Sequence, residues 1–281
     1  MKETNELTSC AVLGLGLIGS AWANHLAADG VLTATWNRTP REGAPAFEPE
    51  IDLIAGKATV LHLVVSDERA ATSVIDQLMP HLTARHLLIQ STTIDPETST
   101  AIKARVERRG ARYLESPFTG SLPAALERKT IFYLGGSAEV IDLAQPYLQR
   151  LSSRRIVIGS NEQACYIKLV MNLQIVSAVE ALAEALTIAR RGGISDQVFF
   201  DAFRENASFS GVAALKEPKL KSGDYSAQFS LKHMAKDMRL LAKSLGDKEF
   251  PALQSARKVL SLGEERGFSN EDISAIIKLL A

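Results

Sequence analysis

The sequence predicts an α/β fold in which a doubly wound, mostly parallel sheet is followed by a long helix and an all-helical C-terminal domain. Short apolar runs alternate with segments of helical period from Cys10 to about Gly159, a pattern typical of a parallel sheet covered by helices. The segment from Glu162 to Arg191 contains neither glycine nor proline, and no strand pattern follows it. The first half therefore predicts one domain, and the second half predicts helices alone.

The first half supplies both the strands and the helices of the predicted sheet domain. The strand candidates are short apolar runs at Cys10–Leu13, Leu32–Trp36, Val60–Val65, Leu87–Gln90, Arg112–Glu115, Ile131–Leu134 and Arg155–Ile158. The helix candidates repeat apolar residues every three or four positions and lie at Leu17–Ala28, Ala70–Leu82, Pro96–Arg109 and Ala138–Leu151. Gly30 and Gly110 stand where helix ends are expected.

The long helix ends in Arg191-Gly192-Gly193, and basic residues followed by glycine mark a helix C-terminus. At about 1.5 Å per residue it forms a rod of roughly 45 Å. A rod of that length needs cover on several sides, so we expect a spine between domains or subunits and a homodimer or a higher homo-oligomer. Further helical patterns lie at Ser195–Glu205, Leu231–Leu245, Pro251–Arg266 and Asn270–Leu280. The predicted domains are 1–160, 161–192 and 193–281.

Composition excludes several classes of protein. The 32 basic residues balance the 32 acidic ones, so no overall charge favours binding to nucleic acid or to an anionic membrane. Cys10 and Cys165 have no metal-ligand spacing, and we expect neither a metal site nor a disulfide. The polar segment 1–9 does not resemble a secretory signal, and charged residues interrupt the apolar helix. We therefore expect a cytoplasmic protein that binds a small molecule.

A glycine triplet lies between the first strand and the first helix. In such a turn the first glycine, here Gly14, permits the bend, Gly16 lets a pyrophosphate approach the backbone, and Gly19 lets helix and strand pack closely. The free N–H groups at the helix N-terminus add positive potential for phosphates. The triplet alone is a weak signal, but its position after a strand and before a helix predicts a Rossmann-like dinucleotide-binding domain. The loop residues Leu15, Leu17 and Ile18 are predicted to line the cofactor.

The end of the second strand indicates which dinucleotide binds. An Asp or Glu at this position would bind the ribose 2′-hydroxyl of NAD, but the sequence has Asn37, Arg38 and Thr39. The Arg38 guanidinium is a permanently charged donor fork suited to a 2′-phosphate. These residues predict NADP(H) as the cofactor, with a solvated loop arginine as the alternative.

Four later segments carry further candidate residues. Ser91–Pro96 and Ser116–Ser121 each follow a strand candidate and by themselves suit a hydroxyl N-cap and a plain turn. Lys168 and Asn172 lie four residues apart, so both side chains lie on one face of a helix. A lysine in an apolar helix is costly unless its charge is paired or its pKa falls, and general acid–base catalysis needs such a group. The last segment, Phe229–Asp237, reads as the start of an amphipathic helix.

Together with the glycine triplet, these segments resemble the β-hydroxyacid dehydrogenase family over nearly the whole chain. This family includes 3-hydroxyisobutyrate dehydrogenases, tartronate semialdehyde reductases and glyoxylate/succinic semialdehyde reductases. The resemblance implies an oxidoreductase that moves a hydride between NADP(H) and a small carbonyl or hydroxy acid. Ser121 in place of the family's second glycine makes the substrate loop similar to that of the glyoxylate/succinic semialdehyde branch.

The resemblance also implies a role for each matching residue. Lys168 is the catalytic acid–base, and Asn172 is its partner. Thr119, Gly120 and Ser121 hold the substrate carboxylate. The implied cofactor contacts on the nicotinamide side are Val65, Ser66, Thr93 and Lys236, with Phe229 packing beside that pocket.

The sequence departs from the family pattern at two positions, and two functions other than a carbonyl reductase stay open. The family's glycines six and four residues before the lysine are Glu162 and Ala164 here, so side chains there could narrow the site. An imine reductase shares the two-domain plan and the use of NADPH but generally lacks a lysine at the position of Lys168. A dinucleotide-binding scaffold or sensor without turnover is the alternative from another class.

Overall fold

The computed structural model describes residues 9–246 and 248–280. The chain divides into two compact units, Met1–Lys168 and Leu169–Ala281, and each is described by itself. Most of the polar segment used above to exclude a secretory signal, residues 1–8, lies outside the described residues, as do residues 247 and 281.

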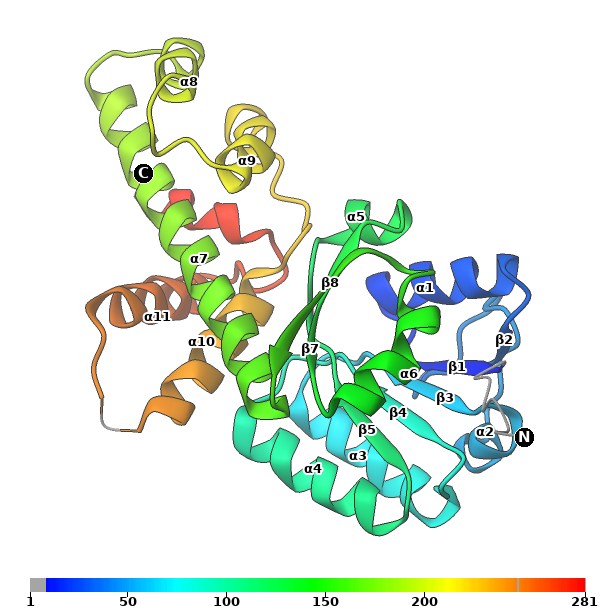
Figure 1. The fold of residues 1–281 in the computed structure, drawn as a ribbon. Helices are drawn as coiled ribbons and strands as arrows, with labels where there is room; N and C mark the ends of the chain where they lie inside the picture. Colours follow the sequence, from blue (N-terminus) through cyan, green and yellow to red (C-terminus); the bar gives the residue numbers. More distant parts are fainter. Residues whose placement is uncertain (1–8, 247, 281) are drawn as a thin grey trace. The chain divides into compact units, whose positions relative to one another are not determined.

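The first unit is built on one sheet, for which the described residues supply eight strands (Figure 1). The strands are β1 (Cys10–Leu13), β2 (Leu32–Trp36), β3 (Val60–Leu63), β4 (Leu87–Gln90), β5 (Arg112–Glu115), β6 (Phe118–Thr119), β7 (Thr130–Gly135) and β8 (Ser152–Gly159). Their order is β2-β1-β3-β4-β5-β7-β6, and β8 pairs with β7. The pairs among β1 to β5 are parallel, whereas β7 is antiparallel to β5 and β6. The predicted mostly parallel, doubly wound sheet is confirmed.

The register of the parallel strands aligns their carboxyl ends. Leu63 of β3 lies opposite both Leu13 of β1 and Gln90 of β4, and Gln90 lies opposite Glu115 of β5. The loops that leave these four strands therefore start at one edge of the sheet. Ligands of open α/β sheets bind at such an edge.

Helices cover both faces of this sheet. They are α1 (Leu17–Ala28), α2 (Ile51–Lys57), α3 (Glu68–Leu78), α4 (Pro96–Arg108), α5 (Leu122–Leu126), α6 (Ala138–Leu148) and the short 3-10 helix η1 (Met79–His81). One core contains Trp22 of α1 and Tyr147 of α6. The other contains Ile54 of α2, Ile75 of α3 and Ile102 of α4.

Three short elements of this unit were not predicted. Helices α2 and α5 are too short to show a helical period, and β6 is a two-residue edge strand in a segment that by itself reads as a turn. The predicted helix at Ala70–Leu82 begins earlier, because Asp67 caps α3 by accepting a hydrogen bond from Ala70 N. Its last turn is η1, which contains Pro80.

The predicted long helix is α7 (Asn161–Arg191), and the boundary between the two units falls within it. In the second unit its Leu169, Val176 and Leu186 are fully buried in the helical core. In the part of the chain that the structure describes, α7 is also long and apolar enough to meet the length and composition criteria for a membrane span. Core helices of soluble proteins meet the same criteria, so one such helix is weak evidence for a membrane span.

The second unit contains helices without a sheet in its described residues. It continues from α7 through α8 (Asp196–Arg204), α9 (Gly211–Ser222), α10 (Leu231–Leu245), α11 (Pro251–Glu265) and the 3-10 helix η2 (Ile273–Leu279). The sequence pattern missed α9 because its buried face includes the charged residues Lys216, Glu217 and Lys219. The helical pattern at Asn270–Leu280 forms the 3-10 helix η2, which Asp272 caps.

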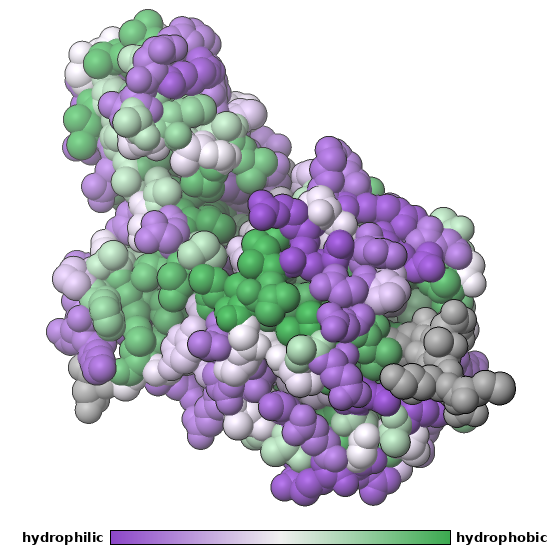
Figure 2. All heavy atoms as spheres, in the orientation of Figure 1, coloured by the Kyte–Doolittle hydropathy of each residue, from purple (hydrophilic) through white to green (hydrophobic). Residues whose placement is uncertain are grey.

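Apolar side chains remain exposed on the second unit near the end of α7 and on α8. Ile188 is 68% exposed, Ile194 is 45% exposed and Val198 is 59% exposed, and Figure 2 shows apolar spheres at this end of the unit. Exposed apolar groups of this kind favour self-association. The homo-oligomer stays a prediction.

Candidate active site

The carboxyl edge of the sheet gathers the predicted cofactor residues of the first unit. The segments that leave the strands there begin at or near Gly14, Asn37, Val65, Thr92 and Ser116. Residues from five separate stretches of sequence therefore meet at one edge, as expected for a dinucleotide site.

The three glycines of the triplet have two different roles. Gly14 has a φ of +107°, and a Cβ there would lie 2.1 Å from the Val64 carbonyl oxygen. A Cβ on Gly19 would lie 1.9 Å from the Gly14 carbonyl oxygen. At Gly16, by contrast, a Cβ would meet no atom of residues 9–246 or 248–280 within 4 Å. The turn itself requires Gly14 and Gly19, whereas Gly16 leaves open space that fits a pyrophosphate.

Helix α1 begins directly after this open space. Gly16 is its N-cap, and no side chain accepts a hydrogen bond there. Among the residues that the structure describes, no side chain therefore caps the first-turn N–H groups, which include those of Leu17, Ile18 and Gly19. They supply the donors and the positive helix end that an anionic phosphate needs.

The segment after β2 shapes the glycine loop and presents a cation. The Asn37 side chain accepts from Leu15 N at 3.0 Å and donates to Thr39 O at 2.7 Å. Asn37 thus orders the loop instead of facing the solvent. Arg38 and Thr39 are exposed, and Arg38 makes no ion pair with any other residue that the structure describes. Its guanidinium is available for a phosphate.

The segments after β3 and β4 are joined through Thr92. Its hydroxyl oxygen accepts from Val65 N at 2.9 Å. The Gln90 amide binds the Thr92 backbone twice, accepting from Thr92 N at 2.6 Å and donating to Thr92 O at 2.7 Å. The neighbouring Thr93 is half-buried. These bonds place the Thr92–Thr93 segment firmly at the carboxyl edge.

The alternative that the hydroxyls after β4 cap α4 is wrong. The N-cap is Asp95, which accepts from Thr98 N at 2.8 Å. Thr93 is therefore not engaged as a helix cap.

Ser66 was predicted to contact the cofactor. It is exposed, and its hydroxyl donates to Asp67 Oδ2 at 2.6 Å.

The predicted substrate loop begins in β6 and ends at α5. Thr119 lies in β6, Gly120 has a φ of +101°, and Ser121 is the N-cap of α5 without a side-chain capping bond. The Thr119 and Ser121 hydroxyls make no hydrogen bond to other residues in the described part of the chain. The sequence analysis did not single out Ser116, whose hydroxyl is buried and unpartnered within the described residues. Several hydroxyls of this loop are therefore able to accept a ligand.

Lys168 lies on α7 within the first unit. It is 9% exposed, and its Nζ lies 5.8 Å from the centre of the Phe118 ring, at the start of the substrate loop. An ammonium over an aromatic face is stabilised electrostatically. The structure thus brings the predicted catalytic lysine to the predicted substrate loop.

The two departures from the family pattern have visible consequences in the first turn of α7. Glu162 accepts from Thr100 Oγ1 of α4 at 2.7 Å. Hydrogen bonds from Ser160 and Thr100 lower the pKa of the Glu162 carboxyl. Ala164 is buried against Gly135, where a Cβ would lie 2.7 Å from the Ala164 Cβ. The Glu162 hydrogen bond therefore joins the first turn of α7 to α4, and the Ala164 side chain packs this turn against Gly135 of β7.

Asn172 and Lys236 lie in the second unit. Asn172 is 1% exposed and donates from Nδ2 to Asp237 Oδ2 at 2.6 Å. Lys236 lies 3.0 Å from Asp237 Oδ1. One carboxylate therefore orients the predicted partner of the lysine and pairs with the predicted cofactor contact.

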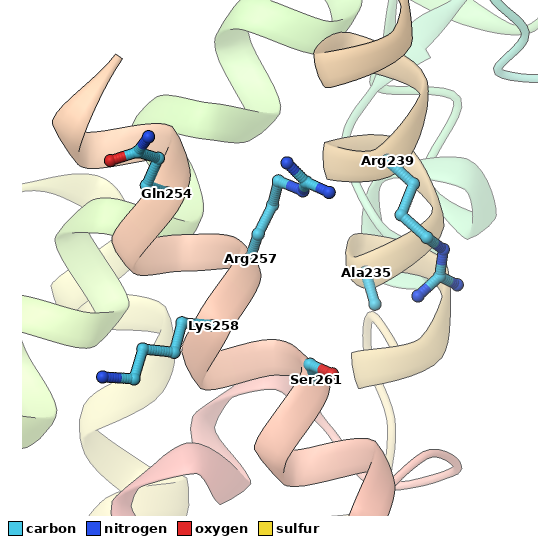
Figure 3. Close-up of a pocket in the computed structure, with 6 residues that line it drawn as sticks. All are labelled: Ala235, Arg239, Gln254, Arg257, Lys258 and Ser261. Carbon is cyan, nitrogen blue, oxygen red and sulfur yellow. The ribbon is translucent and has the colours of Figure 1, made fainter. Parts of the chain in front are cut away.

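The second unit also has a groove lined by basic side chains, and this groove is separate from the predicted site. A groove of about 330 Å³ between α10 and α11 is lined by Ala235, Arg239, Gln254, Arg257, Lys258 and Ser261 (Figure 3). Arg257 points from α11 toward α10 in this view, and Arg239 binds Glu264 at 2.8 Å. None of the predicted site residues lines this groove.

Sequence reasoning missed three residues that shape the site: Gln90, Ser116 and Asp237. Gln90 is a polar residue at the end of the apolar strand β4, and Asp237 is an acidic residue on the buried face of the amphipathic helix α10. A polar residue at an otherwise apolar position is the signal that could have identified both. Ser116 lies directly before Pro117, and nothing in that dipeptide distinguishes it from a turn.

Comparisons with known proteins give the chain a family context. Residues 9–159 match the NAD binding domain of 6-phosphogluconate dehydrogenase. Residues 163–280 match the family described as NAD-binding of NADP-dependent 3-hydroxyisobutyrate dehydrogenase. The two matches together span almost the whole chain.

Individual relatives are distant. Glyoxylate/succinic semialdehyde reductase 1 of Arabidopsis thaliana is 28% identical over 279 residues, which cover 95% of this chain and 96% of that protein. Cytokine-like nuclear factor N-PAC of Drosophila melanogaster is 28% identical over 278 residues, 94% of this chain but 46% of that protein. The structure of Mycobacterium tuberculosis 3-hydroxyisobutyrate dehydrogenase with L-serine has a TM-score of 0.89 at 22% identity, covering 98% of this chain and 99% of that one. The last comparison shows a shared fold.

Proposed function

Because the chain belongs to the 3-hydroxyisobutyrate dehydrogenase, or β-hydroxyacid dehydrogenase, family of NAD(P)-binding oxidoreductases, we propose that it is an NADPH-dependent reductase of short aldehydes or keto acids. The substrate class is one of glyoxylate, succinic semialdehyde and tartronate semialdehyde type. The relative from Arabidopsis thaliana carries the first two names.

One observation carries this proposal: Lys168 is nearly buried and lies over Phe118, at the start of a loop of hydroxyl groups. A reductase needs a proton donor at the substrate oxygen and an anchor for the substrate carboxylate. A buried ammonium serves as the donor. The hydroxyls of Thr119 and Ser121 and the backbone at Gly120 serve as the anchor.

The chain's own residues fit the cofactor. The space beside Gly16 and the uncapped start of α1 accommodate the pyrophosphate, and the exposed Arg38 suits a 2′-phosphate, which favours NADPH over NADH. Val65, Thr93 and Lys236 are the proposed contacts on the nicotinamide side. When bound, the nicotinamide supplies or accepts the hydride.

The chemistry of the protein residues then follows from their types. Lys168 donates a proton from Nζ to the substrate oxygen during reduction and accepts one in the reverse direction. Such general-acid help is typically worth about 10² to 10⁴ in rate. Asn172, oriented by Asp237, binds the same oxygen. The Thr119–Ser121 loop holds the carboxylate so that the carbonyl carbon is positioned for reaction.

Two other functions are separable by experiment. An imine reductase would reduce cyclic imines and would not need the lysine. A dinucleotide-binding scaffold without turnover is the other candidate, since one relative is named a nuclear factor and not an oxidoreductase, although this chain spans only 46% of that protein's length. The presence of Lys168 favours the carbonyl reductase, since a scaffold has no use for a buried acid–base group.

The test is a panel of short aldehydes, keto acids and cyclic imines, scored by NADPH oxidation for the purified wild type and for Lys168→Ala. We expect turnover of a carboxylate-bearing carbonyl compound by the wild type. The variant should lose that activity while its Kd for NADPH stays within a few-fold. Lys103→Ala is the matched control, because Lys103 lies on the surface of α4.

The outcomes discriminate the three functions. Reduction of imines alone would support the imine reductase. NADPH binding without turnover of any compound would support the scaffold. Loss of both activity and NADPH binding in Lys168→Ala, with the control unaffected, would assign Lys168 a structural role and overturn the proposed mechanism.

A further inference from the structure

A buried carboxyl group lies beneath the Thr92–Thr93 segment. Glu115 is the last residue of β5 and is fully buried. Its Oε1 accepts from Gln90 Nε2 at 3.0 Å. Its Oε2 lies within hydrogen-bond distance of two hydroxyls, 2.6 Å from Ser99 Oγ and 2.5 Å from the Tyr113 hydroxyl oxygen. No role has been assigned above to this carboxyl.

The bond from Gln90 determines how the Gln90 amide is oriented. One N–H of this amide binds Thr92 O, the other binds Glu115, and the amide oxygen accepts from Thr92 N. Reversing the amide would place an oxygen against Thr92 O and against Glu115, and a donor against Thr92 N. Glu115 therefore strengthens the preference of the Gln90 amide for the orientation in which it binds both backbone groups of Thr92.

The connection continues to the next strand. Thr92, held in this way, accepts from Val65 N, so the segments that leave β3 and β4 share one hydrogen-bonded chain with Glu115 at its base. Every bond of this chain lies within the first unit, and most of them are buried. Both segments belong to the edge to which the proposed function assigns the nicotinamide half of the cofactor.

We propose that Glu115 is a positioning residue that holds the Val65 and Thr92–Thr93 segments for the cofactor through Gln90. This inference rests on the proposed function for the identity of the ligand. Glu115 is fully buried, and it acts on Thr92 through the Gln90 amide.

The surroundings of Glu115 favour the neutral form. Its partners Gln90 and Ser99 are uncharged, and the titratable groups that face it are the Tyr113 phenol on β5 and the Cys165 thiol on α7. Burial raises the pKa of the Glu115 carboxyl to about 8. A local opening that hydrates the carboxyl would return it toward its ordinary value of about 4.3. Rising pH therefore favours the open form, in which the hold on Thr92 is lost.

The experiment compares two substitutions of Glu115. In Glu115→Gln the new amide still accepts from Gln90 and donates to a hydroxyl, as a neutral carboxyl does. In Glu115→Leu the volume is similar but the bond to Gln90 is absent. We measure the Kd for NADPH from pH 6.5 to 9 and the hydrogen exchange of the Thr92 and Val65 amides in the cofactor-free protein.

We expect Glu115→Gln to bind NADPH within about twofold of the wild type at pH 7 and to lack the wild type's loss of affinity as the pH rises from 6.5 to about 8, a loss that levels off above that pH. Glu115→Leu should bind about tenfold more weakly, the equivalent of one net hydrogen bond. It should also lose exchange protection at Thr92 and Val65. Gln90→Leu should reproduce this effect, and the double variant should be no worse than Gln90→Leu alone.

Ser99→Ala is the matched control, because it removes a partner of Oε2 and leaves the Gln90 bond in place. Unchanged protection of Thr92 in Glu115→Leu would overturn the inference, as would additive effects in the double variant. The exchange measurements need no cofactor. A wild type that fails to bind NADPH would therefore refute the proposed function, while the exchange of Thr92 would still decide the role of Glu115.

Discussion

The amide of Asn172 on α7 donates a hydrogen bond of 2.6 Å to Oδ2 of Asp237 on α10, and both side chains are almost fully buried. An ionised carboxylate only accepts hydrogen bonds. Asp237 therefore fixes the Asn172 amide with its Nδ2 toward α10. The orientation of a proposed catalytic side chain depends on a residue 65 positions later in the sequence.

Asp237→Ala should lower kcat for carbonyl reduction by about 10- to 100-fold, because small errors in positioning a catalytic group carry costs of that order. Asp237→Asn should be milder, since an amide oxygen still accepts from Asn172. Steady-state kinetics measures both variants. Arg239→Ala, which alters an exposed residue of the same helix, is the control. A kcat of Asp237→Ala equal to that of the control would contradict the orienting role.

The sheet domain was predictable because its strands are short apolar runs between clear turns. The predicted bounds of β1, β2, β4 and β5 agree with the structure. The glycine triplet could be placed because both of its neighbours, β1 and α1, have strong patterns of their own. Helix α9 could not be predicted, because three of its buried residues are charged.

Long-range pairing explains the failure at α9. Lys216 forms a buried ion pair of 2.8 Å with Asp272, and Lys219 donates to Ser226 O at 2.6 Å. A buried charge is tolerated when it is paired, but a sequence pattern read locally assigns lysines to the surface. Asp237 and Gln90 escaped notice for the same reason, since their partners define their roles.

The triplet glycines should separate experimentally into folding and binding positions. Gly16→Ala should fold with a Tm close to that of the wild type, because its methyl group would enter open space. It should bind NADPH at least tenfold more weakly, because we expect the pyrophosphate to occupy that space. Gly14→Ala should lower Tm, because its Cβ would collide with the Val64 carbonyl at a φ of +107°. Thermal unfolding and NADPH titration measure the two effects. Normal NADPH affinity in Gly16→Ala would show that the pyrophosphate lies elsewhere.

His62 should make the first unit sensitive to acid. The buried ring stacks on Trp22 at 4.8 Å, and burial lowers its pKa to about 3. Ser91 Oγ donates to Ser116 O, so it accepts from His62 Nε2, and the other ring nitrogen accepts from Tyr147. This pattern suits a neutral ring.

The sign of the pH dependence follows from these pKa values. Below about pH 6.5 the unfolded chain protonates His62, while the folded protein does not until about pH 3. The free energy of unfolding should therefore fall as the pH drops through this window, by up to about 1.4 kcal/mol per pH unit. His62→Phe should be less stable at pH 7 and show a shallower decline between pH 6.5 and 4. Urea unfolding followed by tryptophan fluorescence reports on this unit, since both tryptophans, Trp22 and Trp36, lie in it. Parallel declines in wild type and variant would assign the acid sensitivity to other groups.

Arg38 should determine the preference for NADPH over NADH. Its side chain is exposed, lies directly after Asn37, and makes no ion pair within the described residues. Removing it would therefore leave the glycine loop intact. Arg38→Ala should weaken NADPH binding by one to two powers of ten, about 1.4 to 2.8 kcal/mol, with little effect on NADH. The loss should shrink as the salt concentration rises, because an exposed charge contact is screened.

Titrations of both dinucleotides at two salt concentrations measure this preference. Arg38→Lys is the informative companion, because an ammonium keeps the charge but cannot bind a phosphate through two parallel hydrogen bonds. It should fall between the wild type and Arg38→Ala for NADPH and match both for NADH. Arg41→Ala, at an exposed arginine three residues later, is the control for a nonspecific loss of positive charge. Equal losses for NADPH and NADH in Arg38→Ala would mean that Arg38 contacts a part common to both dinucleotides, and the cofactor preference would then need another source.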